Sequence, residues 1–234
     1  MQLFYNSNVS KADDIFNFDK DESRHIVRVL RKKVGDKLHI TNGKGWLFIS
    51  ELISAEQKHC SAKIISKQEH EKQNYKLHLA VAPTKMNDRF EWLLEKATEI
   101  GIDTITPILC DHSERKVIKT ERFEKIIQSA MKQSLQYHLP KLKPLTTFQD
   151  FIRQDLTGQK FIAHCEETER KSLKSLIEPE TEVTILIGPE GDFSVKEIAI
   201  ALQQNYIPVT LGNTRLRTET AAIIACHSVA ILNE

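Results

Sequence analysis

Hydrophobic and polar residues follow two different patterns along the chain. In the first part, short apolar stretches rich in β-branched and aromatic residues are separated by glycine or polar turns, which is typical of β-strands. These stretches cover residues 37–42, 45–53 and 59–66. One helix is expected over about Glu22–Arg31, with Ile26, Val29 and Leu30 on one face and the cations largely on the other. The pattern predicts a small β-barrel with one helix.

From Tyr75 onward, apolar stretches of strand length alternate with stretches of helical periodicity. The expected strands are 77–83, 102–109, 144–147, 160–165, 182–188 and 207–212, the last three each followed by a helical stretch. Helices are expected at 89–100, which Gly101 should end, at 121–135 and near 148–155. Such alternation predicts an α/β fold whose parallel strands are joined by helical crossovers. In these sheets, ligands bind beyond the carboxyl ends of the strands.

The change of pattern suggests two domains. Residues 67–74, KQEHEKQN, are polar throughout and form the best candidate linker. We therefore expect one domain over residues 1–70 and a second over 71–234.

Composition excludes several classes of protein. The hydrophobic content of 40% and charged content of 28% are ordinary for a soluble globular chain. The longest apolar stretch, 221–232, is interrupted by His227 and Ser228 and is too short to span a bilayer, and no signal peptide is apparent. The four cysteines lie far apart and the nine histidines contain no H-E-x-x-H, so we expect reduced thiols, no metal and a cytoplasmic location.

The net charge of +1 conceals a basic segment. Residues 1–74 carry 13 Lys and Arg against 10 Asp and Glu, whereas residues 75–234 carry 20 against 22. The excess is concentrated in RHIVRVLRKK, Arg24–Lys33, which has five cations and no acid. Two interpretations are about equally favoured: a solvated helix face, or a patch that contacts phosphates.

A first loop of interest lies in TILIGPEGDFSVKEIAIAL, where an apolar strand runs into Gly-Pro-Glu-Gly and then a helix. It is neither a P-loop nor a dinucleotide fingerprint, because the lysine and the third glycine are missing. Gly188 and Gly191 leave room for a ligand against the main chain. Ser194 and Glu197 form an S-x-x-E capping box. Glu190 either satisfies backbone amides or faces a cation.

A second loop, LGNTRLRTETAA, spans residues 211–222. Gly212 and Asn213 indicate a turn, and Thr218 or Thr220 can cap the last helix. Arg215 and Arg217 precede the amino end of that helix, where the helix dipole favours anions rather than cations. We interpret these arginines as functional, aimed at an anionic substrate or at developing negative charge.

Together, LIGPEGDFS and LGNTRLRTETAA resemble the two signature loops of the ribosomal RNA small-subunit methyltransferase E family, uridine-N3 methyltransferases of the SPOUT superfamily. RHIVRVLRKKVGD resembles the PUA-like RNA-binding domain of that family, and DRFEWLLEKATEIG, SERKVIK and MKQS resemble its central motifs. The resemblance implies a deep trefoil knot in the parallel sheet, with knot loops at about 184–194 and 210–220. Asp192 stands at a position that is often glycine in the family.

The resemblance also implies a site and its partners. The cofactor would be S-adenosylmethionine, held by Leu186, Gly188, Pro189, Glu190 and Gly191 on one wall and by Leu211, Gly212, Leu216 and Arg217 on the other. Arg217 would stabilise charge on the uracil oxygens, Glu219 is a candidate base, and Gln133 could orient the base. RNA contacts are expected from Arg24, Arg28, Arg31, Lys32 and Arg115. The partners would be 16S rRNA or the assembled small subunit, and a second copy of the chain in a homodimer.

Two alternatives stay open at this point. A non-catalytic RNA-binding protein could keep the fold, although the intact ligand loops count against it. A SPOUT ribose 2′-O-methyltransferase would be expected to have a different N-terminal arrangement.

Overall fold

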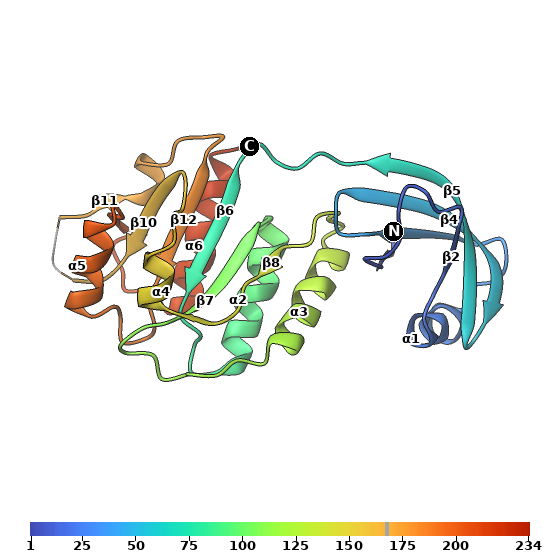
Figure 1. Cartoon of the computed structure of the whole chain (residues 1–234), viewed down its shortest axis with the longest axis horizontal. Coiled ribbons are helices and arrows are strands. Elements are labelled where there is room, and N and C mark those ends of the chain that lie inside the picture. Colours follow the sequence, from blue (N-terminus) through green and yellow to red (C-terminus); the bar gives the residue numbers. More distant parts are fainter. Residues whose placement is uncertain (167–168) are drawn as a thin grey trace. The chain divides into compact units, whose positions relative to one another are not determined.

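The computed structural model describes residues 1–166 and 169–234 (Figure 1). These residues form two compact units. Unit 1 contains Met1–Lys72 and Met131–Leu139, and unit 2 contains Gln73–Ala130 and Pro140–Glu234. Within the described chain, no helix combines the length and apolar character that crossing a membrane requires.

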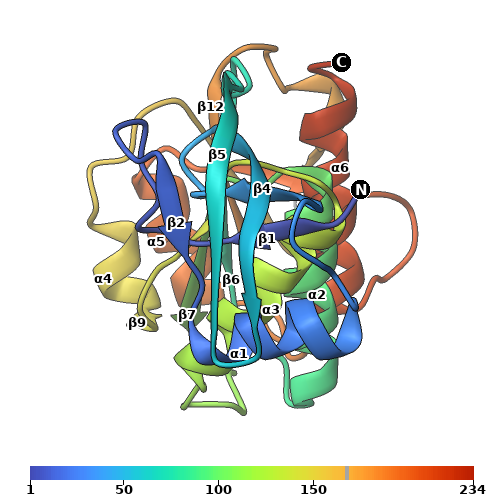
Figure 2. The same ribbon diagram turned by 90° about the vertical axis from the view of Figure 1, so that its right-hand side faces the viewer.

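Unit 1 is built on a five-stranded sheet with the order β1-β3-β4-β5-β2 (Figure 2). The strands are β1 (Leu3–Tyr5), β2 (Ile15–Asn17), β3 (Lys37–Thr41), β4 (Trp46–Glu56) and β5 (His59–Glu69). The three strands predicted from the sequence are confirmed, and β5 continues into the stretch expected to be the linker. In this order β1 and β2 lie at opposite ends of the sheet.

The predicted helix forms in two parts, α1 (Lys20–Arg24) and the π-helical turn η1 (His25–Val29). The wider turn is closed by the Leu30 amide, which donates to the His25 carbonyl five residues back at 3.0 Å. Ile26 is fully buried as predicted. Our placement of Val29 on the buried face was wrong, because the wider turn changes the helical phase and leaves this side chain 64% exposed.

The core of unit 1 lies between the sheet and this helix. It contains buried aromatic and aliphatic side chains from all five strands and from η1, including Phe4, Phe16, Leu38, Phe48, Ile64 and Ile26. The distant segment 131–139 joins the unit through backbone pairing, since the Gly45 amide donates to Tyr137 and the Leu139 amide donates to Gly43, each at 2.9 Å.

Unit 2 is built on a second sheet with the order β11-β13-β10-β12-β6-β7-β8, and β9 pairs with β7. Its strands are β6 (Lys76–Val81), β7 (Thr104–Leu109), β8 (Lys141–Leu142), β9 (Thr146–Thr147), β10 (Gln159–Ala163), β11 (Lys171–Ser172), β12 (Glu182–Ile187) and β13 (Ile207–Thr210). All described pairs in this sheet are parallel, as the alternating pattern predicted.

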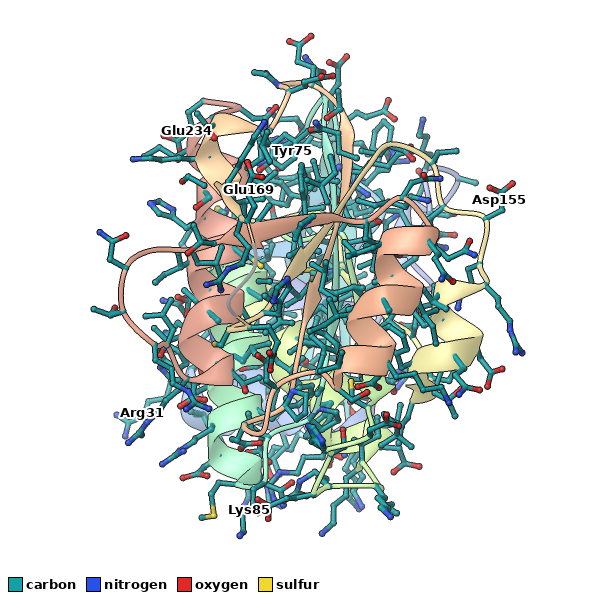
Figure 3. The ribbon with its side chains drawn as sticks, turned by 90° about the vertical axis from the view of Figure 1, so that its left-hand side faces the viewer. Arg31, Tyr75, Lys85, Asp155, Glu169 and Glu234 are labelled. Atoms are coloured by element: carbon teal, nitrogen blue, oxygen red, sulfur yellow. The ribbon has the colours of Figure 1, made fainter. Side chains whose placement is uncertain are left out.

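Helices cover both faces of the unit 2 sheet (Figure 3). On one face α2 (Asn87–Ile100) packs against α6 (Thr218–Ile231), and on the other lie α4 (Phe148–Ile152) and α5 (Val195–Gln203). α3 (Thr120–Gln133) packs beside α2 through Phe123, whose ring lies 5.2 Å from that of Phe90. The strands are buried on both sides, which explains their nearly continuous apolar sequences.

Two local predictions in unit 2 have different outcomes. Gly101 ends α2 in the left-handed conformation with φ of 101°, as expected for a glycine after a helix. The crossover from β10 to β12, in contrast, contains only β11 and a short 3₁₀ turn at Leu173–Ser175 among its described residues, so our expectation of a helical stretch after this strand was wrong. The trefoil knot stays a prediction.

Candidate active site

The main cleft of unit 2 lies at the carboxyl ends of β10, β12 and β13. It consists of two adjoining lobes of about 380 and 300 Å³, which is the size range of small-molecule sites. Both lobes are lined by Ala163, Cys165, Arg215, Leu216 and Ala221. Because parallel strands end at one edge of the sheet, the loops that follow β12 and β13 face the same space.

A buried hydrogen bond joins those two loops. The Thr218 hydroxyl, in the first turn of α6, donates to the carbonyl of Gly188, the residue directly after β12, at 3.1 Å. Our expectation that Thr218 or Thr220 caps α6 was wrong, because Arg217 occupies the cap position and makes no side-chain cap. The Thr218 hydroxyl therefore connects the two walls of the cleft.

The loop after β12 is fixed by the start of α5. Ser194 caps α5 and Glu197 completes the predicted capping box, which is confirmed. Each residue also bonds Asp111, in the loop after β7. The Ser194 hydroxyl donates to the Asp111 carboxylate at 2.6 Å, and the Asp111 backbone amide donates to the Glu197 carboxylate at 3.0 Å. The capping box thus anchors two loops at once.

Asp192 connects the same loop to the end of β10. Its φ of 65° lies in the left-handed region, which explains why glycine suits this position and why the short polar side chain of Asp is tolerated. One carboxylate oxygen accepts from the Cys165 amide at 2.6 Å, and the other accepts from the Phe193 amide at 2.8 Å. The His112 Nδ1 donates to the carbonyls of Gly191 and Asp192 at 3.0 Å each.

The Glu190 carboxylate does both things that the sequence allowed: it accepts from a backbone amide, and its charge adds to that of Glu114 in raising the pKa of the Lys85 ammonium group. Its Oε1 accepts from the Lys85 backbone amide at 2.9 Å, so the carboxylate satisfies an amide of the loop that follows β6. The Lys85 ammonium group pairs with Glu114, with the nitrogen and oxygen 2.8 Å apart.

Arginines dominate the electrostatics of the cleft. Arg170 and Arg215 line the larger lobe, and Arg215 and Arg217 line the smaller one. The two acids of the lining, Glu190 and Asp192, are already engaged by backbone amides. Within the described residues, neither Arg215 nor Arg217 forms an ion pair, so the cleft suits an anionic ligand.

Two further residues of the lining follow β10 directly. Burial lowers the pKa of the His164 imidazole, assisted by Arg170, so the ring is neutral at neutral pH. Partial burial, and then the Asp192 carboxylate, raise the pKa of the Cys165 thiol. The sulfur therefore stays protonated, which makes it a poor nucleophile.

Most residues expected to hold the cofactor line this cleft. The smaller lobe contains Gly188, Pro189, Glu190, Leu216 and Arg217, and the larger lobe contains Leu211, Gly212 and Leu216. Leu186 and Gly191 are not among the lining residues. The Leu186 side chain is fully buried in the core, and a Cβ on Gly191 would lie 3.0 Å from His112.

The three expected catalytic residues have different surroundings. Arg217 is exposed at the cleft, directly before α6. Glu219 is 8% exposed; its Oε1 lies 3.8 Å from the Arg89 Nε, and its Oε2 has no partner among the described residues. Gln133 ends α3, in the segment that belongs to unit 1, and does not line the cleft.

The expected RNA contacts divide between the units. Arg24, Arg28 and Arg31 are exposed on unit 1, and Lys32 is half-buried there. The described residues form no ion pair with these four side chains, although the Arg28 Nε donates to Gln57 at 2.9 Å. Arg115, in unit 2, donates from Nε to the Thr84 carbonyl at 2.9 Å and from Nη2 to the Lys85 carbonyl.

Two models of known protein families match this chain. Residues 70–230 match the model of an RNA methyltransferase domain, and residues 18–65 match that of an RNA methyltransferase PUA domain. A Ribosomal RNA small subunit methyltransferase E from Buchnera aphidicola is 33% identical over 219 residues, which cover 90% of this chain and 85% of the relative. The chain belongs to the ribosomal RNA small subunit methyltransferase E family.

Solved structures agree with membership of the methyltransferase E family. A probable rRNA-methyltransferase from Porphyromonas gingivalis is 39% identical, with a TM-score of 0.93 over 100% of this chain and 98% of that one. A proposed methyltransferase from Legionella pneumophila, solved in complex with the bound cofactor SAM, is 27% identical, with a TM-score of 0.88 over 99% and 97% of the two chains.

Sequence reasoning missed the third wall of the cleft in this methyltransferase E chain. His164, Cys165 and Arg170 lie in the segment after β10. No glycine or capping motif marks this segment in the sequence. The only available signal was its position at the carboxyl end of a predicted strand of an α/β sheet.

Asp192 provides a test of how the loops are held. Asp192→Ala should lower the free energy of unfolding by about 1–3 kcal/mol. The alanine loses the hydrogen bonds to two backbone amides, and it keeps a Cβ at positive φ without the local hydrogen bonds that make this conformation tolerable for Asp. Asp192→Gly should lose less, because it removes only the hydrogen bonds, and Asp192→Asn should lose least. Chemical denaturation followed by circular dichroism measures the three values. An Ala variant as stable as the Asn variant would show that the carboxylate ties do not stabilise the loop.

Proposed function

We propose that this chain transfers the methyl group of S-adenosylmethionine to N3 of a uridine in 16S rRNA. The observation that carries the proposal is the cleft at the carboxyl ends of β10, β12 and β13, which includes the two loops that resemble the signature loops of the family. The likeness to the Legionella protein that was solved with SAM supports the cofactor. The names of the methyltransferase E relatives support the RNA.

The residues present fit this cofactor. Gly212 has φ of 150° and open space where a Cβ would stand, so a ligand can approach its backbone closely. Leu211 and Leu216 supply apolar surface, and the amino end of α6 with Arg217 suits a carboxylate. When bound, S-adenosylmethionine supplies an electrophilic methyl group on a positively charged sulfur.

The protein's own task is to position the uracil and to manage its proton. N3 carries a weakly acidic proton, which must leave as the nitrogen becomes nucleophilic. We propose that Arg217 stabilises the negative charge on the uracil oxygens. Glu219 is the proposed proton acceptor, although it lines neither lobe and its Oε2 is buried without a partner among the described residues. Gln133 would orient the base edge.

We further propose that Arg24, Arg28, Arg31 and Lys32 contact RNA phosphates, and that Arg115 adds a contact through Nη1, the nitrogen left over from its two carbonyl bonds. The substrate would be 16S rRNA or the assembled small subunit, which places the protein in the cytoplasm. A homodimer, in which the second copy completes each site, is part of the same proposal.

Nucleoside mapping tests the function directly. A strain that lacks the gene should lose one 3-methyluridine from its 16S rRNA, and the purified protein with S-adenosylmethionine should restore it. Mass spectrometry of nuclease fragments locates the change. An unchanged 16S rRNA, or loss of a ribose methylation instead, would refute the proposal.

Cofactor binding should depend on Gly212. S-adenosylhomocysteine should bind the wild-type protein, and Gly212→Val should abolish binding, because the substitution strains the backbone and fills the open space of the cleft. Gly35→Val is the matched control, since Gly35 also has positive φ and open surroundings but lies in unit 1. Titration calorimetry measures both, and equal affinities for the two variants would contradict the placement.

The rate of methyl transfer should depend on Arg217. At saturating S-adenosylmethionine, Arg217→Ala should reduce the single-turnover rate by roughly 10²–10³-fold, as expected for a group that stabilises an oxyanion, and it should weaken S-adenosylhomocysteine binding by much less than that. Arg217→Lys should recover only part of the rate, because a point charge cannot replace a planar fork of donors. Arg153→Ala, at an exposed site outside the cleft, should keep the full rate. A defect confined to cofactor affinity would reassign Arg217 to binding alone.

RNA binding should depend on the basic segment of unit 1, Arg24–Lys33. The double variant Arg24→Gln, Arg28→Gln should weaken binding to 16S rRNA and lower the slope of log affinity against log salt by about 0.7–0.9 for each phosphate that the variant no longer neutralises. Lys37→Gln with Lys63→Gln, two exposed cations on the sheet, is the control. If both pairs give the wild-type slope in filter binding, the segment is a solvated helix face.

A further inference from the structure

The loop after β7, residues 111–115, is bonded to both loops that neighbour it at the edge of the unit 2 sheet. β6 lies between β12 and β7, so the loops that follow these three strands are adjacent. Asp111 and His112 bond residues of the loop after β12. Arg115 bonds the loop after β6. Because the loop after β7 lines neither lobe of the cleft, it acts on the site only through these neighbours.

Arg115 holds the backbone of the loop after β6 at two consecutive carbonyls. Its Nε donates to the Thr84 carbonyl at 2.9 Å, and its Nη2 donates to the Lys85 carbonyl. The planar guanidinium makes these two bonds as one rigid fork. The neighbouring pair of Glu114 with the Lys85 ammonium group is exposed, so it contributes little to the position of the loop. The Arg115 fork therefore fixes the peptide group that joins Thr84 to Lys85.

Glu190 bonds the other end of the same peptide group. Its Oε1 accepts from the Lys85 amide at 2.9 Å, and this N–H shares a planar peptide with the Thr84 carbonyl that Arg115 bonds. Because the peptide is rigid and polarised by both partners, it couples the guanidinium to the carboxylate. Glu190 lines the smaller lobe together with Arg217. The position of an acid in the cleft thus depends on an arginine outside the lining.

We infer that Arg115 is a positioning residue for methyl transfer, because it holds the amide that keeps the Glu190 carboxylate in place. This inference rests on the proposed function and adds a residue that acts through its neighbours. A carboxylate released from the Lys85 amide would be free to pair with the Arg217 guanidinium in the same lobe. Arg217 would then be partly neutralised, and it would stabilise the charge on the uracil oxygens less well.

This role differs from a phosphate contact of Arg115 in the quantity that it changes. A phosphate contact through Nη1 contributes to RNA affinity and to its dependence on salt. A positioning role acts on the chemical step, after the RNA and the methyl donor are bound. It therefore changes the maximal rate and leaves the two affinities nearly unchanged. One set of measurements separates the two roles.

The test measures single-turnover methyl transfer by the full-length protein at saturating S-adenosylmethionine, with 16S rRNA or small subunits from the strain that lacks the gene. Arg115→Ala should lower the maximal rate by about 10–100-fold, as expected when a group of the site is misplaced. RNA affinity and S-adenosylhomocysteine affinity should change much less. Arg115→Lys should recover part of the rate, because an ammonium group does not reproduce the fork. Lys116→Ala, which removes the next exposed cation of the chain, should keep the wild-type rate.

Glu190→Gln determines whether Arg115 acts through the carboxylate. The side-chain oxygen of Gln can still accept from the Lys85 amide, but it has no charge that could neutralise Arg217. Arg115→Ala should therefore cause a rate loss at least about threefold smaller in the Glu190→Gln background than in the wild-type background. Hydrogen exchange on the free protein is a readout besides activity. The Lys85 amide should exchange faster in Arg115→Ala than in the wild type or in Lys116→Ala.

The outcomes separate the two proposals. If the wild type transfers no methyl group to 16S rRNA, the proposed function fails and this inference fails with it. If the wild type is active and Arg115→Ala keeps the maximal rate, or loses only RNA affinity, this inference alone is overturned. Equal rate losses in the two backgrounds also overturn it, since a merely structural role of Arg115 does not depend on the charge at Glu190. If Arg115→Ala does not fold, Arg115→Lys takes its place in the same comparison.

Discussion

The cleft depends on the buried hydrogen bond from the Thr218 hydroxyl to the Gly188 carbonyl. This bond fixes the start of α6 against the end of β12, although the two residues are 30 positions apart in the chain. Without it, the loop after β13 would have no buried polar tie to the loop after β12 among the described residues. The parallel sheet brings the strand ends to one edge, and this bond turns two adjacent loops into the walls of one site.

The charge balance of the cleft follows from how its backbone is satisfied. Asp192 and Glu190 use their carboxylate oxygens to accept from backbone amides of Cys165, Phe193 and Lys85. These acids hold the loops together and are therefore occupied. The arginines of the lining keep their charge available, and the amino end of α6 adds to it. Because the two acids are bonded to backbone amides, the cleft keeps a positive charge that suits anionic RNA and a cofactor carboxylate.

In unit 1, the exposure of the cations follows from the local conformation of the N-terminal helix. The π-helical turn at His25–Val29 is followed by Arg31 in the left-handed conformation, with φ of 53°. Ile26 stays in the core while Arg24 and Arg28 remain exposed. The helix therefore anchors the unit with its apolar residues and offers cations to solvent, which agrees with the match of this region to a PUA domain.

The sequence by itself determined most of the strands and helices, the parallel sheet, the capping box at Ser194 and the family, because hydrophobic period, glycine position and loop motifs are local properties. Val29 and Thr218 were misplaced, since a π-turn and a hydroxyl bond to a distant carbonyl have no local signal. The roles of Glu190 and Asp192 also needed the fold, because their partners are amides from other loops. Only the tertiary structure revealed the third wall with His164 and Arg170, since burial without a partner is a property of packing and not of sequence order.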